Sequence, residues 1–219
     1  MNAGQKIRGV KNMIGNGQIK SDEIVKPKEF IMEEENKSDF IDDDFDFVIG
    51  QAISKFLSVL FDYPTEDKVE KSKSLAEFLR AHKDILPDYI VELADEVSKM
   101  RFSENLQADY VSIFDFQTPP FISFCTQVEN PNLILILDSI YASEGVYVDE
   151  TKLPDEFSTI FEFLSLLYSR KRKDKIKYMS VILKPVLRFP EPDHQLYGKV
   201  VKAMKSFVQN FLFEKGGEF

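Results

Sequence analysis

The sequence predicts an all-α fold, a single globular bundle of roughly eight to eleven helices, and three observations lead to this prediction. Apolar residues recur at intervals of three and four positions along most of the chain after residue 43. Prolines, acidic residues and hydroxyl side chains divide these stretches where helices are expected to begin and end. Hydrophobic residues make up 43% of the chain and include 20 Phe, which is enough apolar material for a large core.

The clearest helix is predicted over residues 153–168, LPDEFSTIFEFLSLLY. Pro154 suits the first turn, where its missing N–H would have no partner. Asp155 and Glu156 would then place negative charge beside the free N–H groups of that turn. The basic run 170–173 follows where the helix should end. The apolar face of this central helix is predicted to consist of Phe157, Ile160, Phe161, Leu164, Leu167 and Tyr168.

Residues 1–42 differ from the rest of the chain, and we expect them to form a flexible or loosely docked arm ahead of an all-helical domain over 43–219. Their apolar residues are scattered without a sustained period. The first part of the arm is basic and the second part is acidic. An acidic run is usually a solvated segment, although a specific recognition role is the alternative. Its acids are Glu33, Glu34, Glu35, Asp39, Asp42, Asp43 and Asp44.

The first half of the domain divides into four predicted helices. One starts near Asp44 and should stop just before Pro64. Thr65 is a candidate N-cap for the second, because acidic residues follow it in the first turn. Pro87 opens the third, and residues 104–116 form a short fourth helix.

The second half contains one ambiguous stretch. Pro131 precedes an unbroken apolar run, 133–137, which fits either a buried strand or a helix buried on most sides. Its helical neighbours favour a helix, which Gly145 would stop. Beyond the central helix, Pro185 must kink or end the next one. Asp193 is a candidate N-cap for the last helix.

Charge and cysteine content exclude several classes of function. The chain carries 28 Lys and Arg against 37 Asp and Glu, a net charge of −9, which argues against binding to nucleic acid or anionic membranes. The same charge permits a partner that carries positive charge. The single cysteine, Cys125, excludes an internal disulfide and a cysteine-rich metal site. No segment resembles a secretory signal or a membrane span, so the cytoplasm is the expected location, without membrane insertion.

The usual signatures of catalysis are missing from the sequence. His82 and His194 have no second His or Cys at the spacing of a metal site. Phosphate-binding, dinucleotide-binding, zinc-protease and nucleophile-elbow motifs do not occur. We therefore expect a protein that is not an enzyme and has no cofactor. A small enzyme with paired carboxylates is the competing hypothesis, and it would require two acids converging in one pocket.

Acidic residues beside aromatic ones are the most informative candidates for a binding site. Asp115 adjoins Tyr110 and Phe114, while Asp155, Glu156 and Glu162 lie on or near the central helix. Taken singly, capping explains Asp155 and solvation explains the others. Together, acids beside exposed aromatic rings would suit a peptide that is partly apolar and partly basic.

Three passages in this order resemble the TorD/DmsD/NarJ family of redox enzyme maturation chaperones, which includes the nitrate reductase delta subunit. Residues 55–64, KFLSVLFDYP, resemble the family's first helix with its terminal Tyr-Pro. Residues 106–116, LQADYVSIFDF, are similar to its L-x-x-x-Y-x-x-x-F-D segment. Residues 153–168 resemble its L-P-D-H signature helix. The resemblance covers about residues 45–212 and leaves the arm uncovered.

This resemblance implies an all-helical, non-catalytic chaperone. Such proteins bind the N-terminal segment, often a twin-arginine signal, of a molybdopterin-containing oxidoreductase catalytic subunit until its cofactor is inserted. It also implies a homodimer as one state, formed by helix exchange through connections such as 117–131. Carried over by position, the peptide-binding candidates are Tyr110, Phe114, Asp115, Leu153, Pro154, Asp155, Glu156, Phe157 and Glu162.

One position departs from the family pattern. The family's His after Pro-Asp is replaced by Glu156 here, so the sequence leaves open whether a role that needs an imidazole, or the nucleotide binding proposed for some members, carries over. An acid at this position would still attract a basic peptide. The alternative interpretation of the whole chain is a general helical interaction scaffold unrelated to redox enzyme maturation.

Overall fold

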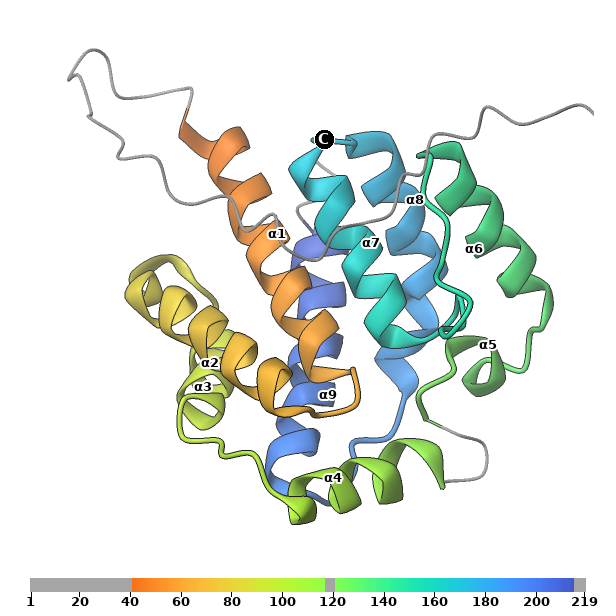
Figure 1. The fold of residues 1–219 in the computed structure, drawn as a ribbon. Coiled ribbons are helices and arrows are strands. Elements are labelled where there is room, and N and C mark those ends of the chain that lie inside the picture. Colours follow the sequence, from red (N-terminus) through yellow and green to blue (C-terminus); the bar gives the residue numbers. More distant parts are fainter. Residues whose placement is uncertain (1–40, 117–120, 215–219) are drawn as a thin grey trace, which may run out of the picture.

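The computed structural model describes residues 41–116 and 121–214, and helices are the regular secondary structure of these residues (Figure 1). Nine α-helices are joined by short 3₁₀ and π-helical turns, and no strand occurs in the described ranges. The predicted all-α fold with roughly eight to eleven helices is confirmed. The helices are α1 (Ile41–Leu60), α2 (Glu66–Ala81), α3 (Asp88–Val97), α4 (Glu104–Tyr110), α5 (Phe124–Gln127), α6 (Asn132–Ser143), α7 (Phe157–Ser169), α8 (Lys173–Leu183) and α9 (Gln195–Phe207).

Two predictions fall partly outside these ranges. Residues 1–40 of the arm expected over 1–42 lie outside the described residues. In the connection 117–131, where helix exchange is expected, residues 117–120 also lie outside the described residues.

Among the helices of the described residues, none combines the length and the apolar content that crossing a bilayer would require.

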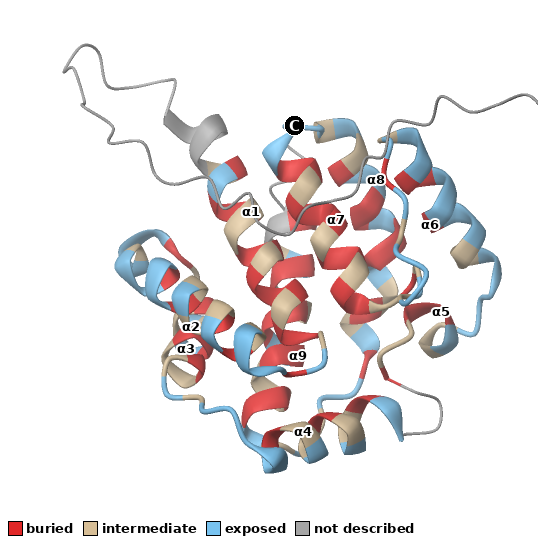
Figure 2. Ribbon diagram, viewed as in Figure 1, coloured by how far each residue is buried: buried red, intermediate tan, exposed pale blue. Residues whose placement is uncertain are grey.

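Helices α1 and α7 form the centre of the bundle and run antiparallel. The Phe61 ring, just after α1, contacts the Phe157 ring at the start of α7, with centroids 5.2 Å apart. At the other end, the Phe47 and Tyr168 rings lie 6.3 Å apart. Figure 2 shows buried residues concentrated on α1, α7 and α9 in the middle of the molecule. Burial of these apolar faces is the main source of stability, because it removes them from water.

The helix boundaries mostly follow the predicted capping residues. The Thr65 hydroxyl accepts from the Lys68 N–H at 3.4 Å, as expected of an N-cap. The predicted cap of the last helix is wrong by one residue, because His194 and not Asp193 takes that position. Its Nδ1 accepts from the Tyr197 N–H at 3.2 Å.

The ambiguous apolar run is a helix, α6, which Gly145 ends with a positive φ of 71°. It lies at the edge of the bundle (Figure 1) and buries one face, through Leu137, Ile140 and Tyr141. Leu135 on the opposite face is 70% exposed. The unbroken apolar run suggested a helix buried on most sides. In the structure the helix is buried on one face only.

The start of the central helix differs from the prediction by three residues. Helix α7 begins at Phe157, so Pro154, Asp155 and Glu156 precede it and do not form its first turn. The reason is a competing set of backbone hydrogen bonds. The Phe124 N–H donates to the Asp155 carbonyl at 3.0 Å, and the Phe157 N–H donates to the Ile122 carbonyl at 3.3 Å. These bonds hold Glu156 extended, in an isolated antiparallel bridge with Ser123. Residues 153–156 form a turn, in which the Glu156 N–H donates to the Leu153 carbonyl at 3.3 Å.

The close approach of α1 to α7 requires a glycine at position 50. A Cβ atom there would overlap the buried Tyr168 ring. We predict that Gly50→Ala lowers the free energy of unfolding by about 1–2 kcal/mol, since overpacking a core outweighs the gain in helix propensity. Urea denaturation followed by circular dichroism measures this. In a Tyr168→Leu background the same change should cost less; an equal cost in both backgrounds would contradict the steric explanation.

Candidate functional site

The three passages that resemble the chaperone family meet at the C-terminal end of α1. The Tyr110 hydroxyl donates to the carbonyl oxygen of Phe61 at 2.8 Å. The Phe61 ring contacts the Phe114 ring at 5.7 Å and the Phe161 ring at 5.8 Å, besides Phe157. Residues from 55–64, 106–116 and 153–168 therefore share one aromatic cluster, although they lie about 50 positions apart in the sequence.

The aromatic members of the predicted site lie in the core, not on the surface. Tyr110 is 2% exposed, and Phe114 and Phe157 are fully buried. Burial raises the pKa of Tyr110, and the nearby carboxylates of Asp115 and Asp62 add to that effect. The expectation that these rings stand exposed beside acids is wrong in this structure. They face the bundle because each lies on the apolar side of its helix or turn.

Asp155 is also buried, at 1% exposure, and it caps a different helix from the one expected. Its Oδ2 accepts from the Cys125 N–H at 3.1 Å and from the Ser123 hydroxyl, at the start of α5. The neighbouring Pro154 carbonyl accepts from the Tyr141 hydroxyl at 2.7 Å. The Leu-Pro-Asp sequence thus connects α5 and α6 to the start of α7.

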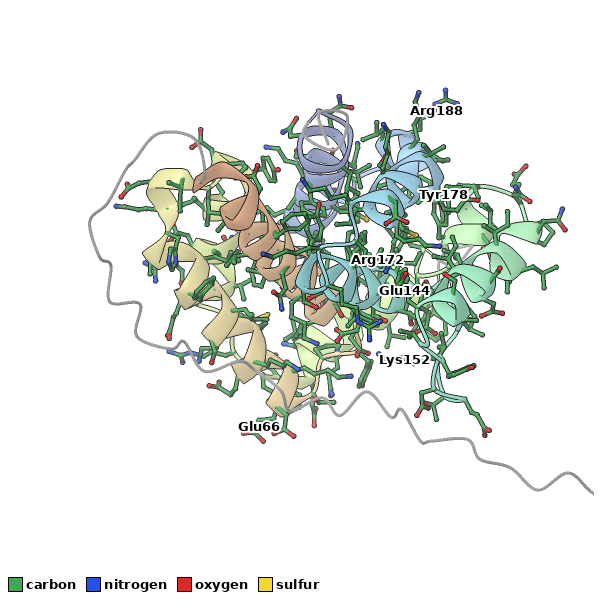
Figure 3. The ribbon with its side chains drawn as sticks, turned by 90° about the horizontal axis from the view of Figure 1, so that it is seen from above. Glu66, Glu144, Lys152, Arg172, Tyr178 and Arg188 are labelled. Carbon is green, nitrogen blue, oxygen red and sulfur yellow. The ribbon has the colours of Figure 1, made fainter. Side chains whose placement is uncertain are left out.

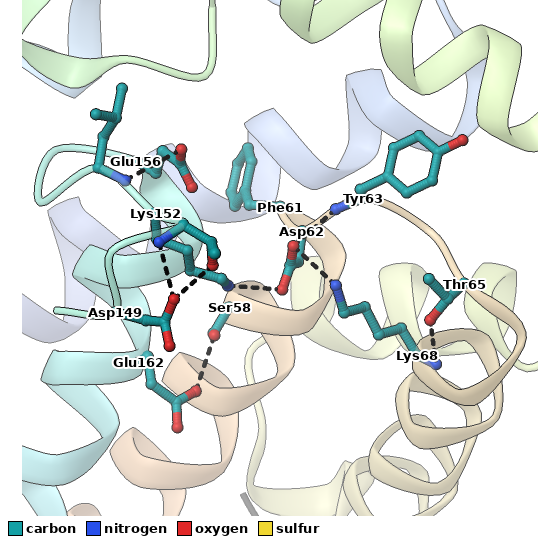
Figure 4. A network of polar contacts seen from close by, with 12 residues as sticks. Ser58, Phe61, Asp62, Tyr63, Thr65, Lys68, Asp149, Lys152, Glu156 and Glu162 are labelled. Atoms are coloured by element: carbon teal, nitrogen blue, oxygen red, sulfur yellow. Dashed lines mark hydrogen bonds and ion pairs between the residues drawn. The ribbon is translucent and has the colours of Figure 1, made fainter. Parts of the chain in front are cut away.

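Glu162 joins the two central helices through polar contacts. Its carboxylate forms an ion pair with Lys55, and its Oε2 accepts from the Ser58 hydroxyl at 2.9 Å. Both partners lie on α1, so this pair fixes α7 against α1. Figure 4 shows the Ser58–Glu162 contact beside the end of α1.

Besides Glu162, which is also half-buried, Glu156 and Asp115 are the predicted acids that reach the surface. Glu156 is half-buried, and its Oε1 accepts from the Leu153 N–H at 3.3 Å. Burial raises its pKa, against the opposing effect of that hydrogen bond. Asp115 is exposed, and partial desolvation raises its pKa as well. Both carboxylates lie close enough to Tyr110 to raise the pKa of its hydroxyl.

A third carboxylate, Asp62, belongs to this site but was not among the candidates from the sequence. It binds Lys68 at 2.9 Å and Lys152 at 2.8 Å (Figure 4). Burial alone would raise the pKa of Asp62, but its hydrogen bonds and charge interactions with the two lysines lower it. Its position directly before Tyr63-Pro64, at the end of a predicted helix, was the available signal.

Apolar side chains that surround these acids remain accessible. Tyr63 is 40% exposed, Leu153 is 54% exposed and Phe116 is 80% exposed. The Tyr63 ring lies 5.7 Å from the Tyr110 ring, Phe116 directly follows Asp115, and Leu153 bonds to Glu156. We call Tyr63, Asp115, Phe116, Leu153 and Glu156 the α1-end surface. It presents acids and apolar groups together, which suits a partly apolar and partly basic peptide.

A surface hollow of about 420 Å³ adjoins the segment that carries this surface. It lies between the C-terminal half of α6 and residues 146–154, and Pro154 and Lys152 belong to its lining. A second cavity, beneath Asp62 and Pro64, measures about 20 Å³ and has room for a single water molecule.

Within the described residues, no group of three or more His, Cys, Asp and Glu side chains is arranged to hold a metal ion. The Cys125 thiol is buried, and burial together with the nearby Asp155 raises its pKa to about 12. At neutral pH this cysteine is a thiol and a poor nucleophile. His194 lies 3.3 Å from the Asp109 carboxylate and caps α9.

Comparison with known proteins finds a similar fold but no significant sequence match. No model of a known protein family matches the sequence, and no curated protein matches it significantly. The structure is similar to the crystal structure of a candidate redox enzyme maturation protein from Archaeoglobus fulgidus, with a TM-score of 0.52 and 21% sequence identity. The match covers 83% of this chain and 99% of that chain. The protein therefore shares its fold with this candidate redox enzyme maturation protein.

The two half-buried acids of the site should affect stability with opposite dependence on pH. The raised pKa of Glu156 means that folding favours its neutral form, a contribution present at low pH and lost as pH rises through the folded-state pKa. Glu156→Gln should therefore be more stable than the wild type at pH 7, with the difference shrinking towards pH 4.

Asp62 should affect stability in the opposite sense, because its pKa is lowered in the folded protein. Its contribution to the free energy of unfolding is present at neutral pH and is lost as pH falls through the folded-state pKa. Asp62→Asn should cost on the order of 1 kcal/mol at pH 7 and less on acidification. Urea titrations between about pH 2.5 and pH 7 measure both variants, because the Asp62 contribution is lost mainly below the ordinary aspartate pKa. Glu77→Gln on the exposed face of α2 is the control. The same sign for both variants at pH 7 would contradict this description of the site.

Proposed function

We propose that the protein is a non-catalytic maturation chaperone for a redox enzyme. The client would be the catalytic subunit of a molybdopterin-containing oxidoreductase, bound through its N-terminal or twin-arginine leader segment. Binding would delay assembly or export of that subunit until its cofactor is inserted, and this work would take place in the cytoplasm. The observation that carries the proposal is the convergence of all three family-like passages on the end of α1, in a chain with a maturation-protein fold.

The proposed contact region is the α1-end surface and not the buried rings beneath it. Asp115 and Glu156 would attract the basic residues of the leader, while Leu153, Tyr63 and Phe116 would cover its apolar residues. Three of these side chains are large and at least 40% exposed, so they can bury area when a partner binds. The net charge of −9 would add a long-range attraction that weakens with salt.

The class of client is tested by isolating the protein from its native cells with a tag and identifying bound proteins by mass spectrometry. We expect a large molybdopterin oxidoreductase subunit to be recovered, and recovery should fail when the leader segment of that subunit is deleted. Exclusive recovery of unrelated proteins, with the client expressed, would favour the general scaffold and leave the shared fold without functional meaning.

The site is tested by measuring the affinity of a synthetic leader peptide, taken from the recovered subunit, by isothermal titration calorimetry. We expect Asp115→Asn combined with Glu156→Gln to weaken binding roughly 5- to 30-fold at low salt, and less at high salt. The control variant, Glu66→Gln with Glu77→Gln on α2, changes net charge equally but should bind as the wild type does. Equal affinity for all three proteins would remove the α1-end surface from the proposal.

A further inference from the structure

The turn between α7 and α8 carries a concentration of positive charge in an otherwise acidic protein. Six of the eight residues from 170 to 177 are basic, although the whole chain has a net charge of −9. Arg172 contacts the Glu144 carboxylate at 2.9 Å, and Figure 3 shows the two side by side; Arg170 lies 3.7 Å from the same carboxylate. We call this the basic patch: Arg170, Lys171, Arg172, Lys173, Lys175 and Lys177.

The start of α1 lies against this patch. The Lys173 Nζ lies 5.7 Å from the centroid of the Phe47 ring, and that ring packs on Tyr168 at the end of α7. Burial raises the pKa of Tyr168, and the Asp46 carboxylate adds to the effect, so an acid of α1 already faces this end of α7. The N-terminal part of α1 therefore lies close to the basic patch.

The segment that precedes α1 is acidic. Residues 33–39, EEENKSD, carry four carboxylates and one lysine, Lys37. Three further aspartates, at positions 42–44, follow in the first turn of α1. An acidic segment therefore comes directly before α1 in the sequence. In the structure, the start of α1 lies beside the basic patch.

Chain length limits which lysines these acids can reach. Ile41 is six residue steps along the chain from Glu35. An extended chain spans at most about 3.4 Å per step, or roughly 20 Å in all. Helix α1 has 20 residues and is therefore about 30 Å long. The patch beside the start of α1 is within reach, whereas Lys68 and Lys152 lie at the far end, bound to Asp62.

We propose that the acidic segment Glu33–Asp39 binds the basic patch of the same chain. Each exposed ion pair contributes little by itself, but the short connection to α1 makes the local concentration of acid high and the closure cost small. The interaction is therefore weak per contact and sensitive to salt. Its effect is to shield the basic patch from polyanions such as nucleic acids and anionic lipids, a role separate from the binding of a client.

Carbodiimide cross-linking tests the contact directly, because it joins a carboxylate and a lysine amine in contact as an amide, with loss of water. On the full chain at low protein concentration, we expect peptides containing Glu33, Glu34 or Glu35 to be linked to Lys171, Lys173, Lys175 or Lys177. These links should decrease several-fold in 0.5 M salt. Links to Lys68 or Lys152, links only in covalent dimers, or none to the patch would overturn the proposal.

Retention on immobilised heparin tests the shielding. Neutralising the segment by Glu33→Gln, Glu34→Gln and Glu35→Gln should make the full chain elute at a higher salt concentration. The matched control neutralises three acids on α2 by Glu66→Gln, Asp67→Asn and Glu77→Gln, and so changes the net charge equally. An equal increase in both variants would show an effect of net charge alone and would overturn the shielding.

Discussion

The carbonyl group and ring of Phe61, at the end of α1, are the point on which the candidate site depends. The carbonyl accepts a hydrogen bond from the buried Tyr110 hydroxyl, and the ring packs against Phe114, Phe157 and Phe161. A buried hydroxyl without a partner is costly, so Tyr110 strongly favours this one arrangement. The end of α1, the α4 region and the start of α7 are therefore fixed relative to one another, and the surface acids around them take their positions from this cluster.

Residues in the passages that resemble the chaperone family thus have two kinds of role. Tyr110, Phe114, Phe157 and Asp155 are buried and hold segments together. Glu156, Asp115 and Leu153 lie at or near the surface and remain accessible to a partner. A substitution in the first group would affect binding indirectly through stability, and only the second group can distinguish recognition from folding.

Much of the fold could be predicted from the sequence because helix periodicity and capping are local. Thr65, Pro87 and Gly145 mark helix boundaries where expected. The start of α7 could not be predicted, because the hydrogen bonds that keep residues 154–156 out of the helix come from residues 122–124. For the same reason the sequence suggested a surface role for Tyr110 and Phe157. Periodicity identifies an apolar face, but it does not show whether that face contacts the core or a partner.

Hydrogen–deuterium exchange of the protein with and without its client's leader peptide tests the central claim most directly. If the α1-end surface binds the leader, amide protection should increase at residues 61–64, 111–116 and 153–157, while the turn at 170–177 should not gain protection. Protection confined to α6, α8 or α9, with no change around Phe61, would contradict the claim and place the binding site elsewhere on the same fold.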